Sequence, residues 1–141
     1  MPNALYPKYK QKIANPGTLG TTSGDAVDLA DDTIKVALVD TGVYTYSGTH
    51  EYYSSVSSAV VGTPQTLASK TTTDGVFDAA DVTFTSVTGN SVEAYVIYKD
   101  TGTASTSPLI AFIDTVASGL PVTPNGGNIT ITFNASGIFA I

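Results

Sequence analysis

The stretch TIKVALVD, residues 33–40, indicates the fold class, because it carries apolar residues on both faces of an extended strand. Successive side chains of a strand point to opposite faces of the sheet. Ile34, Val36 and Leu38 share one face, and apolar residues also occupy the other. A strand of this kind lies inside a sheet that is covered on both sides. The stretch therefore predicts a central strand.

Further strands are predicted on either side of this stretch. VEAYVIYKD (92–100) is the longest continuous apolar one, and NITITF (128–133) alternates between apolar and polar residues. The other predicted strands cover residues 66–72, 75–79, 81–87 and 108–114, and GIFAI (137–141) closes the chain. Short strands separated by turn residues are typical of antiparallel β proteins. We expect an all-β fold, an antiparallel β-sandwich or barrel of about eight short strands.

The predicted core consists of the apolar residues on the inner faces of these strands. They are Ile34, Val36, Leu38, Phe77, Phe84, Val96, Ile97, Ile110, Phe112, Ile129, Ile131 and Phe139.

The N-terminal part of the chain has a different character. Residues 1–14 are compatible with a short helix, and Pro and Gly residues make 15–25 a loop. We therefore divide the chain into an N-terminal arm and loop, residues 1–25, and a single β-sandwich domain, residues 26–141. Within that domain, HEYYSSVSS (50–58) is compatible with one or two helical turns.

Composition and charge exclude several classes of function. The 141 residues include 6 lysines, no arginine and 12 acidic residues, which gives a net charge of −6. Such a chain repels phosphate backbones, so we expect no nucleic-acid binding. No run approaches the ~18 apolar residues of a membrane span, and the first 25 residues lack the apolar centre of a signal peptide. We expect no membrane partner and no Sec-type export.

Asp-Thr-Gly occurs twice, at 40–42 and 100–102, and suggests an aspartic protease. That chemistry needs two carboxylates about 3 Å apart that share one proton. Asp100 follows Lys99, whose ammonium group favours an ionised carboxylate. A dimeric peptidase that uses only Asp40 is a less favoured alternative, because the supporting apolar-apolar-Gly strand is missing. Asp-Thr-Gly is also a good turn, so we expect two strand ends and no catalytic residues.

His50 and the acidic run GDAVDLADD (24–32) are the other candidate chemical features. His50 has no nucleophile motif such as G-x-S-x-G beside it, so we expect it at the surface or in an interface. The aspartates could offer oxygen ligands to calcium, but they lack the Gly and terminal Glu of a helix-loop-helix site. We expect a solvated acidic loop, no metal and no cofactor.

Tyrosines cluster in the arm and in the connection that follows the strand predicted at 33–40, and the arm also carries three lysines. We expect these residues to contact a partner. Tyrosine is enriched at protein interfaces, and the arm carries half of the basic residues of an acidic chain. The alternatives are a solubilising tail and ordinary packing at the rim of the sandwich. The predicted interface residues are Tyr6, Lys8, Tyr9, Lys10 and Lys12 in the arm, and Tyr44, Tyr46, His50, Tyr52 and Tyr53 in the connection.

Several blocks of the sequence resemble a group of small proteins encoded among the virion genes of tailed bacteriophages. These blocks are NALYPK (3–8), DTIKVALVDTGVYTYS (32–47), DGVFDAADVTFTSVTGNSVEAYVIYKDTGT (74–103), SPLIAFIDT (107–115) and GLPVTPNGGNITITF (119–133). The resemblance implies a structural component of the virion without enzymatic activity. It does not decide between head, neck and tail.

From this resemblance and the charge pattern we expect a capsid decoration or cement protein, with a tail, neck or fibre protein as the alternative. Its partners would be other virion proteins, above all the major capsid protein, and further copies of itself. We expect the arm to grip the partner, so that deleting residues 1–14 would abolish binding and leave the body folded.

Overall fold

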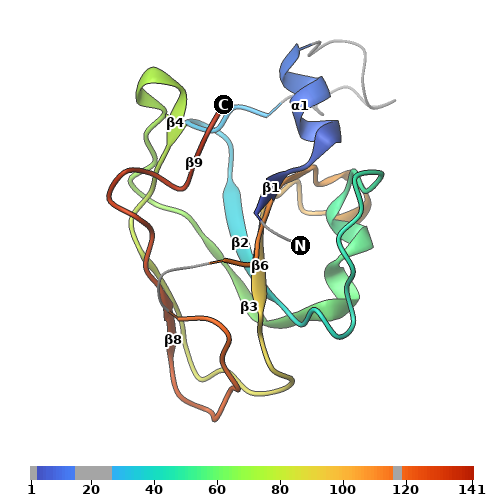
Figure 1. The fold of residues 1–141 in the computed structure, drawn as a ribbon, viewed down its shortest axis with the longest axis vertical. Coiled ribbons are helices and arrows are strands. Elements are labelled where there is room, and N and C mark those ends of the chain that lie inside the picture. The colour runs from blue at the N-terminus through green and yellow to red at the C-terminus, as the bar shows by residue number, and fades with distance from the viewer. Residues whose placement is uncertain (1–2, 15–26, 116–118) are drawn as a thin grey trace.

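The computed structural model describes residues 3–14, 27–115 and 119–141, and an open antiparallel sheet of five strands forms its centre (Figure 1). In spatial order the strands are β1 (Ala4–Leu5), β7 (Leu109–Ile113), β6 (Ala94–Lys99), β2 (Ile34–Val39) and β3 (Val60–Thr66). Two ribbons of two strands complete the β-structure. They pair β4 (Val76–Phe77) with β9 (Phe139–Ala140), and β5 (Val82–Phe84) with β8 (Ile129–Ile131). The predicted all-β, antiparallel fold is confirmed.

Helical structure is sparse in the described residues. It comprises the α-helix α1 (Pro7–Ala14) and the 3-10 turns η1 (Tyr53–Ser55), η2 (Ser57–Ala59), η3 (Thr73–Gly75) and η4 (Ala104–Thr106). The short helix expected in residues 1–14 and the two helical turns considered for 50–58 are confirmed. Pro7 begins α1, where its fixed φ suits the first turn and its missing N–H removes no helical hydrogen bond.

Both faces of the central sheet are covered, as Figure 1 shows with the sheet seen nearly edge-on. The ribbons β4–β9 and β5–β8 lie on one side, and the segment 40–59 lies on the other. Ring contacts of β6 support this arrangement: Tyr95 meets Phe133 with 6.0 Å between ring centroids, and Tyr98 stacks on Tyr53 at 4.1 Å. This double cover explains why β2, β6 and β7 are apolar almost throughout.

The predicted core is confirmed for eleven of its twelve residues, which are buried; the twelfth, Phe139, is half-buried. The prediction omitted the tyrosines, although five of them belong to the same core. These are Tyr6, Tyr9, Tyr44, Tyr95 and Tyr98. A tyrosine buries a large ring at little cost when its hydroxyl finds a partner, so composition alone could not separate these five from surface tyrosines.

The strand predicted at residues 66–72 is wrong, because the strand of this region, β3, occupies Val60–Thr66. β3 contains Gly62, with φ +74°, and Pro64, which both read as loop residues in the sequence. It is an edge strand, where proline loses no ladder hydrogen bond. Its pairing with β2 is irregular between Val36 and Leu38, and this irregularity accommodates both residues.

The described part of the arm, residues 3–14, belongs to the folded body. Ala4 pairs with Phe112 across β1 and β7, and the backbone N–H of Tyr6 donates to the carbonyl of Ile110 at 2.9 Å. Pro7 then ends β1, which keeps this edge strand short. The domain boundary predicted at residue 25 would place these residues outside the domain, although they are hydrogen-bonded to its sheet. Residues 15–25 of the arm lie outside the described residues.

Replacing Gly137 with alanine should lower the free energy of unfolding by about 2–4 kcal/mol. Gly137 has φ +114°, and a Cβ added there would clash with Val76 Cγ1, at the junction of β4 and β9. Gly126→Ala is the matched control, because Gly126 has φ +88° but no atom within 4 Å of the added Cβ. The control should cost about 1–2 kcal/mol from backbone strain alone. Equal losses in urea unfolding would show that the contact with Val76 has no effect.

Candidate interaction surfaces

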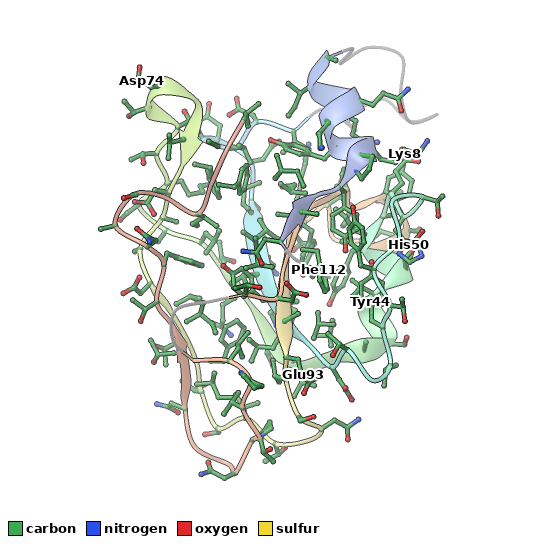
Figure 2. The ribbon with its side chains drawn as sticks, in the orientation of Figure 1. Lys8, Tyr44, His50, Asp74, Glu93 and Phe112 are labelled. Atoms are coloured by element: carbon green, nitrogen blue, oxygen red, sulfur yellow. The ribbon has the colours of Figure 1, made fainter. Side chains whose placement is uncertain are left out.

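The arm and the connection that carry the predicted interface residues contact each other within one chain (Figure 2). The hydroxyl groups of Tyr6 and Tyr44 are hydrogen-bonded at 2.8 Å, and the Tyr44 hydroxyl lies 2.8 Å from His50 Nδ1. Tyr6 is 0% exposed. Burial and the hydrogen bond to Tyr44 raise the pKa of Tyr6 well above its ordinary value.

Aromatic rings extend this contact onto the sheet. Tyr46 lies 5.1 Å from Tyr6 and 5.4 Å from Phe112 of β7, between ring centroids, and Tyr44 lies 6.1 Å from Phe112. Tilted ring pairs at these distances add to the energy of burial. The segment 44–50 is therefore fixed to the sheet through both its own rings and the ring of Tyr6.

Lys12 forms the second link between α1 and the connection. Its Nζ lies 2.5 Å from Glu51 Oε1 and 5.3 Å from the centre of the Tyr52 ring. The side chain of Lys12 is 3% exposed. A lysine buried to this degree needs a paired charge, and Glu51 supplies it from the same chain.

These contacts correct part of the predicted interface. Tyr6, Tyr9, Lys12 and Tyr44 are buried against their own chain, so they stabilise the fold and offer no free surface to a partner. The structure does bring these tyrosines and lysines together, but the sequence could not show that the arm and the connection contact each other. For Lys8, Lys10, Tyr46, His50, Tyr52 and Tyr53, which keep some exposed surface, contact with a partner stays a prediction.

We call four of these residues the attachment face: Lys8 on α1, and Tyr46, His50 and Tyr52 on the connection that contacts the arm. Lys8 precedes Lys12 by one helical turn, which places it on the side of α1 that meets the connection. Figure 2 shows Lys8 and His50 on this side of the molecule. Lys8 makes no ion pair with any residue that the structure describes.

Both Asp-Thr-Gly segments are turns at strand ends, as expected. Asp40 follows β2 and accepts a hydrogen bond from the N–H of Gly42 at 2.8 Å, and Asp100 follows β6 and does the same for Gly102 at 2.9 Å. Because β2 and β6 are antiparallel neighbours, their C-terminal ends lie at opposite ends of the strand pair, about 20 Å apart at ~3.4 Å per residue. The two carboxylates of one chain therefore cannot form a catalytic dyad.

Asp100 is further engaged by a lysine from the neighbouring strand. Lys35 Nζ lies 2.9 Å from Asp100 Oδ2, and this contact holds the pKa of Asp100 below its ordinary value. The sequence suggested Lys99 for this role, but Lys99 pairs with Asp32 at 3.1 Å.

Two carboxylates of the acidic run, those of Asp28 and Asp32, accept hydrogen bonds within the run. Asp28 Oδ1 accepts hydrogen bonds from the N–H groups of Ala30 and Asp31, and Asp32 Oδ2 accepts one from the N–H of Asp28. Asp25 lies outside the described residues. In the part of the chain that the structure describes, no three His, Asp or Glu side chains gather closely enough to hold a metal ion. None of its helices is long and apolar enough to cross a membrane.

A second exposed surface was not predicted from the sequence. Ile13 on α1 is 41% exposed and the C-terminal Ile141 is 60% exposed, and both line the same two hollows. We call these two side chains the isoleucine ridge. An isolated isoleucine at the end of a short basic helix gives no periodic signal, and only the fold brings it to Ile141.

No protein-family model matches this chain, and no curated protein matches it either.

Proposed function

We propose that this chain is a non-enzymatic structural protein of a tailed-phage virion, and specifically a protein that decorates or cements the capsid. The proposal is supported by the resemblance of the sequence blocks, which runs over most of the chain. The structural observation that carries it is the attachment face, where aromatic side chains and a cation stay partly exposed on a rigid support.

The support beneath this face is what makes it suitable for binding. Tyr46 and His50 are held from below by the buried pair Tyr6 and Tyr44, and Tyr52 is held by Lys12. Side chains fixed before binding lose little conformational entropy when a partner covers them. Tyrosine and histidine in such positions supply large contact area with few rotatable bonds.

The mode of attachment therefore differs from the one expected from the sequence. The arm does not reach out to grip a neighbour, because its described residues are bound to β7 and to the connection. The partner instead meets a preformed face, with Lys8 directed at an acidic site. On a particle with many identical sites, modest contacts of this kind add up when copies are also linked to one another.

A tail, neck or fibre location is the alternative within the same class. The number of copies per particle separates the two locations, because a capsid lattice offers hundreds of sites whereas neck and tail rings are built from few subunits. Quantitative mass spectrometry of purified particles gives this number. Absence of the protein from the particles would contradict the proposal altogether.

Replacing Lys8 with glutamate should reduce binding to particles that lack the protein by about tenfold or more, because it reverses the charge on the attachment face. Thr73→Glu is the control, since it also places a glutamate at an exposed position, but in η3 beside Asp74, which Figure 2 shows on the opposite side of the molecule from Lys8. Copies bound per particle are measured by cosedimentation at several protein concentrations. Equal binding of the two variants would contradict the assignment of this face.

A further inference from the structure

The isoleucine ridge separates two open hollows, of which one has Asp28 and the ion-paired Lys12 in its wall and the other has Lys10. The first hollow, about 400 Å³, lies between α1 and residues 27–30, with Tyr9, Val27 and Leu29 in its wall and Asp28 at its side. The second, about 380 Å³, lies between α1, β1 and the C-terminus, and its wall includes Leu5, Ala14, Ala140 and Lys10. Ile13 and Ile141 belong to both walls.

This surface is unusual for the molecule on which it lies. Ile13, Ile141 and Val43 are the large hydrophobic residues that remain well exposed in the described part of the chain, and two of the three meet here. Contiguous exposed apolar surface on a soluble domain commonly marks an interaction site.

We propose that the isoleucine ridge is the centre of a two-fold dimer interface, with a second copy of this chain as the occupant. A two-fold interface brings the same patch of both copies together, so the patch must complement itself in shape and charge. With the two-fold axis parallel to the ridge, the ridge of each copy lies in the partner's first hollow. The same rotation places Lys10 of each copy over Asp28 of the other.

Charge favours a second copy over an unrelated partner. Lys10 forms no ion pair with a described residue of its own chain, whereas Lys12, Lys35 and Lys99 all do. Asp28 is exposed at the opposite side of the ridge. The patch thus carries both members of an ion pair, separated by the apolar ridge, and symmetry pairs them twice. At a surface without such complementary charges, the net charge of −6 on each copy would make two copies repel each other.

The dimer leaves the attachment face free. Lys8, Tyr46, His50 and Tyr52 line neither hollow, so one copy can contact its partner through the ridge and another protein through the attachment face. The inference concerns the purified chain and holds whether or not the protein is part of a virion.

Sedimentation equilibrium of the purified protein tests the proposal. We expect a dimer that dissociates on dilution, and Ile13→Asp should raise its dissociation constant by about 30-fold or more, as expected for a residue at the centre of an interface. Lys10→Glu should raise it by about threefold to tenfold. Gln11→Glu, on the same helix and outside both hollows, should leave it unchanged. Circular dichroism checks that each variant is folded.

Disulfide cross-linking gives a second, independent result. The chain has no cysteine, so Ile13→Cys introduces a single thiol on the ridge, and Gln11→Cys introduces one on another side of the same helix, outside both hollows. Mild oxidation should link two copies of the Ile13→Cys protein rapidly and those of Gln11→Cys slowly. A native protein that stays monomeric at millimolar concentration would overturn the proposal. This is also the result expected if another segment of the same chain, and not a second copy, were the occupant of the ridge. A dimer that Ile13→Asp leaves intact would overturn it as well.

Discussion

Replacing Tyr6 with alanine is expected to lower the free energy of unfolding by about 3–5 kcal/mol, as for other large aromatic residues in protein cores. Tyr6 is fully buried, its ring packs on Tyr46, and its hydroxyl is bonded to that of Tyr44. The alanine variant would leave a cavity beneath the connection, and the Tyr44 hydroxyl would lose its hydrogen bond to Tyr6. Urea unfolding followed by circular dichroism measures the loss.

Tyr6→Phe is the matched control for this prediction. It keeps the ring and removes the hydroxyl group, so it should cost about 0.5–1.5 kcal/mol. A Tyr6→Ala variant that is no less stable than Tyr6→Phe would show that the arm does not pack on the domain.

The same contacts change what is expected from deleting residues 1–14. The sequence led us to expect a folded body that has lost only its binding arm. The structure leads us to expect a destabilised body, because the deletion removes β1 from the edge of the sheet and uncovers Tyr44 and Phe112. Loss of particle binding by such a deletion would therefore say nothing about a contact made by the arm.

Raising the pH above about 10 is expected to unfold the protein cooperatively. Tyrosine in an unfolded chain has a pKa of about 10, whereas burial raises the pKa of Tyr9 to about 12 and those of Tyr6, Tyr95 and Tyr98 further. Above pH 10 the unfolded chain binds fewer protons than the folded one, so stability falls as the pH rises. Below pH 10 the buried tyrosines are protonated in both the folded and the unfolded chain, so the fold keeps its full stability there. For Tyr9 alone, the difference between its pKa in the folded and in the unfolded chain lowers the free energy of unfolding by roughly 2–3 kcal/mol at pH 12.

Tyrosinate absorbance and circular dichroism, recorded along the same alkaline titration, test this expectation. Most of the absorbance should appear together with the loss of the β signal. Tyr9→Phe removes one buried ionisable group and keeps its ring, so it should move the transition to higher pH. Gradual ionisation of all tyrosines near pH 10 with the fold intact would contradict the burial of these side chains.

The central strands could be predicted from the sequence because their signal is local. In β2 and β6 nearly every residue is apolar, and this pattern arises only where both faces of a sheet are covered. The two Asp-Thr-Gly turns were predictable for the same reason, since an aspartate bonds forward to a backbone N–H two residues later. β3 failed because an edge strand tolerates the glycine and proline that mark a loop elsewhere.

The pairing of surfaces could not be predicted, because it depends on contacts between distant parts of the chain. Tyr6 and Tyr44 are 38 residues apart in the sequence, and Lys12 and Glu51 are 39 residues apart. Tyrosine and lysine suit an interface within a chain as well as one between chains. Which of the two they form is decided by the return of the arm to β7, and residue type carries no information about that return.

The attachment face requires the arm to be part of the rigid body, and amide hydrogen exchange of Tyr6 measures this most directly. Its N–H donates to the carbonyl of Ile110 on β7. We expect this amide to exchange as slowly as that of Ile97 in the middle of β6, through global unfolding. Exchange of the Tyr6 amide at the rate of an unstructured peptide, while Ile97 stays protected, would contradict the account.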